Sequence, residues 1–216
     1  MPTGRSAATG ESSLTLQRGL ALLQAVADAE TDSVGISELA TAVGVSRAAV
    51  YRLLVPLVER GLLWRDGTRV RLGAGLLVLA GRVLPQLRVA VLPILRELAE
   101  SVGATAFLSL AEGAESQVVA VVEPSWTVLH VGYRVGSRQP IDRGATGRAL
   151  QLAEDGPPWV AARGELEVGT AELAAPVRGV PGVRACVGML SFAELHAESV
   201  GPQLVRAATS VAATLR

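Results

Sequence analysis

The break Gly44-Val45-Ser46 constrains this chain more than any other feature, because it separates two amphipathic segments by a tight turn. The first segment, 37–43, starts with a capping serine followed by a glutamate, and the second, 46–60, starts with Ser46 as its own cap. Gly61 ends the second segment, as glycine commonly does at the carboxyl end of a helix. The sequence therefore predicts two helices joined by a tight turn.

Two strand-like runs follow the second helix. Residues 62–65 and 69–72 flank Asp66-Gly67-Thr68, which is typical of a β-hairpin turn. Before the turn, apolar residues at helical spacing over 14–29 predict a further helix that packs under the other two. Three helices and a hairpin in this order predict a winged helix-turn-helix domain over residues 13–72.

Arginine is concentrated in this region. From Ser46 to Leu72 there are six arginines against two acidic residues, whereas the formal net charge of the whole chain is zero. A local positive patch is what contact with phosphates requires, although many arginine-rich helical hairpins are merely solvated surfaces. The turn, the small alanines and the wing favour double-stranded DNA as the partner. The candidate DNA-binding residues are Gln17, Arg18, Ser46, Arg47, Ala48, Ala49, Tyr51, Arg52, Arg65, Arg69 and Arg71.

Beyond the wing, the pattern changes from helical to mainly extended. Residues 73–84 form an apolar helical segment that Pro85 is expected to end, and it serves either for packing between domains or as a dimer contact. Further helices are predicted over 88–102, 144–153 and 198–215, and strands over 105–111, 117–122, 128–133, 171–177 and 184–191. We expect an α+β fold: the winged domain, a linker helix over 73–86, and an antiparallel sheet flanked by helices over 87–216.

Composition limits the classes of protein that fit. With half of its 216 residues hydrophobic, the chain can build two modest cores. No apolar run approaches the roughly 18 residues that span a bilayer, and the N-terminus lacks the apolar core of a secretory signal. We therefore expect a soluble, cytoplasmic protein without a membrane partner. Residues 1–12 are small and polar, and we expect a disordered tail there.

Residue types suited to catalysis or metal binding are sparse. His130 and His196 have no partners at the spacing of a zinc site. Cys186, the single cysteine, lies in an apolar run, where a buried and inert thiol is the expected state. Glu165 and Glu167 lie close together in a glycine-flanked loop, where carboxylates are usually solvated. We expect no enzyme, no catalytic residue, no metal and no cofactor.

Ordered motifs along the chain resemble those of the IclR-type transcriptional regulators. In the first half these are Leu16-Gln17-Arg18-Gly19-Leu20, Ile36-Ser37-Glu38-Leu39-Ala40, Val45-Ser46-Arg47-Ala48-Ala49-Val50-Tyr51-Arg52-Leu53-Leu54 and Arg71-Leu72-Gly73. In the second half they are Gly144-Ala145-Thr146-Gly147-Arg148-Ala149-Leu150, Arg163-Gly164-Glu165-Leu166-Glu167-Val168-Gly169 and Leu173-Ala174-Ala175-Pro176-Val177. Each motif is weak by itself, but the ordered set is specific and covers nearly everything from Leu14 to Arg216.

The resemblance implies a regulator that is more often a repressor than an activator. It implies a homodimer or a dimer of dimers, with a GAF-like domain that binds a small organic effector. The implied effector-binding residues are Val128, Val131, Ala145, Thr146, Gly147, Glu172, Gly188 and Leu190. The alternative is a DNA-binding protein whose C-terminal domain only oligomerises.

Two features of the implied effector site depart from the family. Gly188 and Leu190 stand where many relatives carry hydroxyl groups, and Glu172 adds an acid, which together disfavour a small carboxylate. The segment 151–162 is too short for the usual pair of covering helices, with Trp159 as a candidate replacement for part of that cover. The helix start at 144–147 by itself favours an anion, unless its glycines only permit a tight turn.

Overall fold

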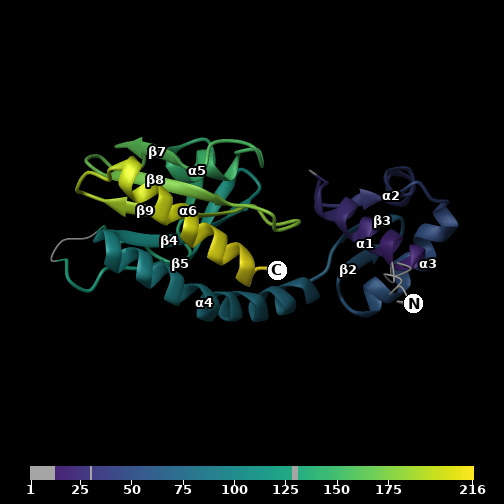
Figure 1. Ribbon diagram of the computed structural model, residues 1–216. Coiled ribbons are helices and arrows are strands. Elements are labelled where there is room, and N and C mark those ends of the chain that lie inside the picture. Colours follow the sequence, from purple (N-terminus) through teal and green to yellow (C-terminus); the bar gives the residue numbers. More distant parts are fainter. Residues whose placement is uncertain (1–12, 30, 128–130) are drawn as a thin grey trace, which may run out of the picture. The chain divides into compact units, whose positions relative to one another are not determined.

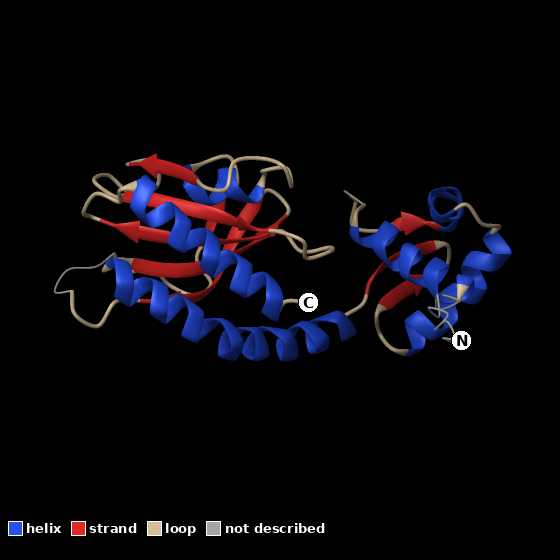
Figure 2. Ribbon diagram, viewed as in Figure 1, coloured by secondary structure: helices blue, strands red, loops and turns tan. Residues whose placement is uncertain are grey.

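A computed structural model describes residues 13–29, 31–127 and 131–216 of the chain (Figure 1). The predicted tail over 1–12, and the candidate residues Val128 and His130, lie outside the described residues. The chain divides into two compact units, Met1–Arg82 and Val83–Arg216. The first unit is mainly helical, and the second combines helices with a larger sheet (Figure 2).

Three helices and a three-stranded antiparallel sheet form the first unit. The helices are α1 (Leu14–Ala27), α2 (Ile36–Val43) and α3 (Arg47–Glu59). The strands, in sheet order, are β1 (Val34–Gly35), β3 (Arg69–Leu72) and β2 (Leu63–Asp66). One core collects apolar side chains from the helices and the sheet, among them Leu22, Leu39, Val50, Leu54, Leu63 and Val70. The predicted winged helix-turn-helix is therefore present, with β1 as a strand that the sequence did not predict.

Two residues set the turn between α2 and α3. Gly44 follows α2 with a φ of 69°, in the left-handed region that glycine enters at little cost. Ser46 caps α3 as predicted, since its Oγ accepts a hydrogen bond from the Ala49 amide at 3.2 Å. The two helices differ in direction by 99°. The predicted cap of α2 is wrong: Gly35 is the capping residue, and its amide donates to Glu38 Oε2 at 3.0 Å.

The predicted helix end at Pro85 is also wrong. A single helix, α4, runs from Gly75 to Val102 and contains both Pro85 and Pro93. Leu87, Val91 and Leu95 on this helix are buried in the core of the second unit, and this packing holds the helix together through the proline positions. The absence of a long apolar run was likewise an incorrect expectation, because α4 is long and apolar enough to span a membrane by length and composition alone. Part of that apolar surface is the core face just described.

The second unit is a six-stranded antiparallel sheet with helices on both faces. In sheet order the strands are β6 (Arg138–Pro140), β5 (Glu115–Val122), β4 (Thr105–Glu112), β9 (Ala185–Ser191), β8 (Ala171–Val177) and β7 (Val160–Arg163). The α4 residues of this unit and α6 (Ala197–Thr214) cover one face and form the larger core with it. The short helix α5 (Gly144–Leu150) packs on the other face (Figure 1).

The edges of this sheet differ from the expectation. The strands β6 and β7 were not predicted, because three and four residues carry too little pattern and only their pairing with β5 and β8 defines them. Residues 131–133 belong to no strand, so the predicted strand over 128–133 is wrong in its described part. Trp159 packs against Gly201 of α6, where an added Cβ would lie 2.6 Å from the ring. It therefore supports the helix α6 rather than covering the α5 side.

Candidate functional site

The amino-terminal half of α3 presents polar and small side chains to solvent. Val50 and Leu54 on the opposite side of this helix are buried, so the orientation of α3 is fixed by the core. Val58 lies at the helical spacing of these core residues, which predicts burial, but it is 37% exposed. The predicted DNA-binding residues of this element are all exposed except the half-buried Ala49, namely Ser46, Arg47, Ala48, Tyr51 and Arg52.

Two arginines of the wing stack on aromatic rings. The Arg65 guanidinium lies 5.5 Å from the centre of the Tyr51 ring, which connects the wing to α3. The Arg71 guanidinium lies 4.2 Å from the Trp64 ring, and these two residues are paired across the hairpin. Trp64 is 45% exposed and was not among the predicted DNA-binding residues. Its direct opposition to Arg71 in a two-stranded hairpin was the signal that could have identified it.

No ion pair within the described residues neutralises the arginines of α3 or the wing. Arg69 is exposed on β3, and Arg18 and Gln17 are exposed on α1. Asp66 lies opposite Arg69 in the hairpin register but forms no ion pair with it, so the arginine side chains remain available to phosphate groups. The α3 and wing candidates thus lie on one unit, and their contact with DNA stays a prediction.

The most concentrated polar contacts of the second unit meet at the start of α5. The buried Glu172 of β8 accepts a hydrogen bond from the Ala145 amide at 2.7 Å and one from the Thr146 amide at 3.0 Å. A third, shorter bond joins the Thr146 hydroxyl to the same carboxyl group. Burial raises the pKa of Glu172, and these hydrogen bonds oppose the rise. Three of the predicted effector residues therefore bind one another.

A second carboxylate contacts the same helix start from solvent. Glu165 accepts from the Gly144 amide at 3.1 Å and forms an ion pair with Arg148 at 2.9 Å. The hydrogen bond from Arg148 lowers the pKa of Glu165. Glu165 was expected to be merely solvated; it is exposed, but it holds the first amide of α5. The predicted free amides at 144–146 are therefore all in use.

Aromatic and aliphatic side chains fill the space beside the Glu172 carboxyl group. Phe107 of β4 pairs with Gly188 of β9, and an added Cβ at 188 would lie 2.2 Å from the Phe107 ring. The Tyr133 ring meets Phe107 edge-on, with 4.8 Å between the ring centres. Val131 and Leu190 are buried in the same cluster. Three predicted effector residues, Val131, Gly188 and Leu190, thus contact protein side chains in this structure.

Gly147 has a different role from the predicted one. A Cβ on this residue would lie 2.3 Å from the carbonyl oxygen of Ile141, so glycine permits a close approach of two backbone segments. Gly144 has a φ of 69°, and the absence of a side chain there leaves room for Glu172. An added Cβ would lie 2.6 Å from Glu172 Oε2. Both glycines serve the packing of α5, as the tight-turn alternative anticipated.

Some polar atoms in this interior have no hydrogen-bond partner. They include the Ser109 hydroxyl, in a fully buried residue of β4, and the Tyr133 hydroxyl. Burial, and then the nearby charge of Glu172, raise the pKa of Tyr133, and the same two causes raise the pKa of Cys186. Cys186 is buried as expected. Among the described residues no group of three or more His, Cys, Asp or Glu side chains could hold a metal ion.

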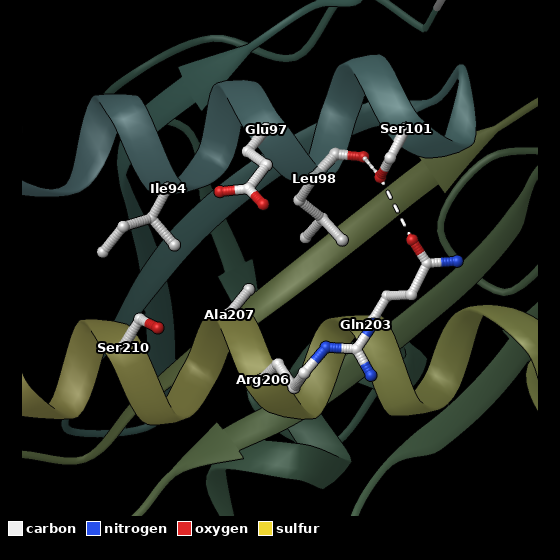
Figure 3. Close-up of a pocket in the computed structure, with 8 residues that line it drawn as sticks. All are labelled: Ile94, Glu97, Leu98, Ser101, Gln203, Arg206, Ala207 and Ser210. Carbon is white, nitrogen blue, oxygen red and sulfur yellow. Dashed lines mark hydrogen bonds between the residues drawn. The ribbon is translucent and has the colours of Figure 1, made fainter.

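One groove of the second unit lies elsewhere, between α4 and α6. Its volume is about 280 Å³, and Figure 3 shows Glu97 of α4 and Arg206 of α6 on opposite sides of it. A hydrogen bond of 3.1 Å between the Ser101 hydroxyl and Gln203 crosses the groove. None of the predicted effector residues lines it. The groove therefore lies on the helix-covered face of the sheet, opposite α5.

The first unit matches a known family model. Residues 15–67 match the IclR helix-turn-helix domain. The acetate operon repressor of Salmonella typhimurium is 28% identical over 148 residues, which cover 65% of this chain and 54% of the repressor. The chain thus spans about half the length of this curated relative.

Solved structures share the fold over nearly the whole chain. A candidate transcriptional regulator of Rhodococcus sp. RHA1 is 25% identical with a TM-score of 0.52, and the match covers 95% of this chain and 100% of the other. An IclR homologue from Microbacterium hydrocarbonoxydans, solved in complex with 4-hydroxybenzoate, is 21% identical with a TM-score of 0.54 over 94% and 99% of the two chains. The match over residues 15–67 thus identifies an IclR-type helix-turn-helix domain, and the chain shares its α+β fold with these solved structures.

Proposed function

We propose that the protein is a sequence-specific, operator-binding regulator and that it acts as a repressor. The observation that carries the proposal is the set of exposed, unpaired arginines on α3 and the wing of a matched helix-turn-helix domain. The likeness to the acetate operon repressor supports the direction of regulation. The role needs no catalytic residue, and it places the protein in the bacterial cytoplasm, where its DNA target lies.

In the proposed mode of binding, α3 enters the major groove and the wing contacts flanking phosphates. Arg47 lies at the first turn of α3, where side chains of a recognition helix reach base edges. Arg69 lies on the wing, where contact with a phosphate contributes affinity but no sequence information. A homodimer would place two such helices in successive grooves of an operator with two half-sites.

Fluorescence anisotropy tests this proposal with the full chain, the duplex upstream of its own gene and a scrambled duplex, at two salt concentrations. We expect Arg47→Ala to weaken specific binding by about 1–3 kcal/mol and to relax the preference at one base position. Arg69→Ala is expected to weaken binding to both duplexes and to reduce the salt slope by about one. Arg184→Ala, an exposed arginine of the second unit, is the matched control and should change neither property.

Unchanged affinity for both variants of the first unit would show that α3 and the wing are not the contact elements. Selective binding by the wild type together with losses in both variants would establish them. Weak and equal binding of the wild type to the two duplexes would argue against the chosen operator, and duplexes selected from a random pool would then replace it.

We further propose that the second unit modulates DNA affinity through a small organic effector. The support is the shared fold with a relative that was solved in complex with 4-hydroxybenzoate. The competing proposal is that this unit only oligomerises, and the protein-filled interior beside α5 favours it. Thermal unfolding and DNA anisotropy with a panel of small acids, amines and alcohols separate the two proposals. A compound that raises the Tm and changes the DNA affinity supports effector sensing. If no compound changes the Tm or the DNA affinity, oligomerisation alone is supported.

A further inference from the structure

We propose that Glu172 is an internal ligand of the second unit, which occupies a carboxylate site at the start of α5 and thereby excludes carboxylate effectors. The exclusion of effectors rests on the proposed sensing function of this unit. The internal site itself rests only on the contacts of the buried side chain. Glu172 is then the residue that determines which ligands the domain accepts.

The contacts of Glu172 are those of a bound anion. The amides of Ala145 and Thr146 and the Thr146 hydroxyl all donate to its carboxyl group, from a segment 26 and 27 residues away in the chain. Glu172 is 4% exposed, so solvent contributes little to this arrangement. Backbone amides that converge on a buried carboxyl group form a preorganised site, and each bond is stronger when that group is ionised.

The space beside the carboxyl group is also filled from within the chain. The Phe107 ring occupies the place that a side chain at Gly188 would take, and Tyr133 packs edge-on against it. An aromatic acid consists of a ring and a carboxylate. In this chain Phe107 and Glu172 supply those two groups from adjacent parts of the same interior.

Two unpartnered hydroxyl groups show that this interior is more polar than a packing core requires. Ser109 is fully buried and its hydroxyl has no partner. It pairs across the sheet with Cys186, whose Sγ lies 3.9 Å from the Thr146 carbonyl oxygen, so Ser109 lies on the same face of the sheet as α5. The second unpartnered hydroxyl is that of Tyr133, whose pKa is raised first by burial and then by the nearby charge of Glu172. A buried unpaired hydroxyl is costly, so these two groups are not explained by packing alone.

Replacement of Glu172 by alanine removes a CH₂–COO⁻ group, which acetate matches in size and charge. We expect Glu172→Ala to lower the Tm by at least about 4 °C in sodium chloride, because buried donors lose their acceptor. Sodium acetate at the same ionic strength should restore several degrees, with a rise that follows the logarithm of its concentration. The wild type should show no such difference between acetate and chloride.

Glu165→Ala is the matched control, since it removes an exposed carboxylate from the same helix start. Acetate should not restore its Tm relative to chloride. A folded Glu172→Ala that acetate does not stabilise, or an equal acetate effect in the control, would overturn the proposal.

Wild-type NMR gives a readout that does not depend on the folding of the variant. The amide signals of Ala145 and Thr146 should not change with acetate or benzoate, because Glu172 holds them. A saturable shift of these signals would overturn the internal site. If neither the wild type nor the variants bind DNA, but acetate still raises the Tm of Glu172→Ala, the proposed function is contradicted and this inference is not. If a carboxylate compound changes the DNA affinity of the wild type, this inference is contradicted and the proposed function is not.

Discussion

At the scale of single residues, the interior of the second unit depends on the absence of a side chain at Gly188. The strand register places Phe107 opposite this glycine, and the ring occupies the free volume. A methyl group at 188 would lie 2.2 Å from the ring, well inside contact distance. A displaced Phe107 would disturb Val131 and Leu190, which belong to the same cluster. The pair thus fixes the packing beside α5.

We expect Gly188→Ala to lower the free energy of unfolding by about 1–3 kcal/mol through overpacking, as measured by urea denaturation. Adding Phe107→Leu should recover part of the loss, because the smaller side chain vacates the position that the new methyl group needs. Gly81→Ala, at an exposed helical site with nothing within 4 Å, is the control and should be neutral or stabilising. Equal losses at 188 and 81 would exclude the steric explanation.

Glu172 also makes stability depend on pH. Burial raises its pKa above the ordinary 4.5, whereas hydrogen bonds from Thr146 and Ala145 and the charge of Arg148 act to lower it. Tyr133 and Cys186 are the other ionisable groups nearby. The folded state therefore retains this proton to higher pH than the unfolded state does. Stability should fall as pH rises from the ordinary carboxyl pKa through the raised one, and then level off.

The measurement is urea denaturation of the wild type and Glu172→Gln at several pH values between 4 and 8. We expect the wild type to lose stability relative to the variant as pH rises over this range, because the amide does not ionise. A difference that stays constant with pH, or changes in the other direction, would show that burial does not control this carboxyl group.

At the scale of elements, α4 is continuous where its sequence predicts an end. Proline lacks an amide hydrogen and clashes with the preceding turn, so each proline inside a helix is unfavourable. Apolar contacts made after Pro85 and on both sides of Pro93 outweigh this cost: Leu87, Val91 and Leu95 are 0–7% exposed. The Arg88 guanidinium also donates to the Val119 carbonyl oxygen at 2.8 Å. Tertiary packing thus overrides the local signal.

Pro85 is exposed, so its replacement removes the helix-breaking effect without opening a cavity. We expect Pro85→Ala to raise the free energy of unfolding by up to about 3 kcal/mol and to increase the helical circular dichroism signal. Pro157→Ala, in an exposed loop, should give no increase. A destabilised Pro85→Ala would mean that a bend at this position is needed by the fold.

At the scale of the whole molecule, α4 carries apolar surface that the described chain does not cover. Leu77 is 75% exposed and Val89 is 74% exposed, and Val78, Leu79 and Val83 are also exposed. Clustered exposed apolar side chains on one element are typical of an interface between proteins. A second copy of the chain is the partner that the proposed dimeric regulator requires.

Light scattering on purified protein should therefore give the mass of a dimer or a larger even assembly. We expect Leu77→Glu to shift the distribution toward the monomer, because a buried charge would be unpaired at the interface. Thr209→Glu, an exposed change on α6, is the control and should leave the mass unchanged. A wild-type monomer at micromolar concentration would contradict the assignment of α4 as an interface.

Elements defined by caps, turns and periodicity within a few residues could be predicted from the sequence. Elements that are very short, or that depend on contacts with distant segments, could not. Ser46 and Gly44 define the turn before α3, and Asp66-Gly67 defines the wing, through contacts within a few residues. The edge strands β6 and β7 exist only because β5 and β8 pair with them. In the same way, the proposed DNA-binding face follows from residues close in sequence, but the stacking of Arg65 on Tyr51 depends on the folded wing.

The sequence by itself determined that the chain has a helix-turn-helix with a basic wing and a second α+β domain, because periodicity, caps and charge act locally. Only the tertiary structure decided what the effector residues contact. Glu172 and Thr146 are 26 residues apart, and the sheet register and the packing of α5 bring them together. The same register sets Phe107 on Gly188. Whether a predicted site is open or filled depends on such long-range contacts, and no local pattern records them.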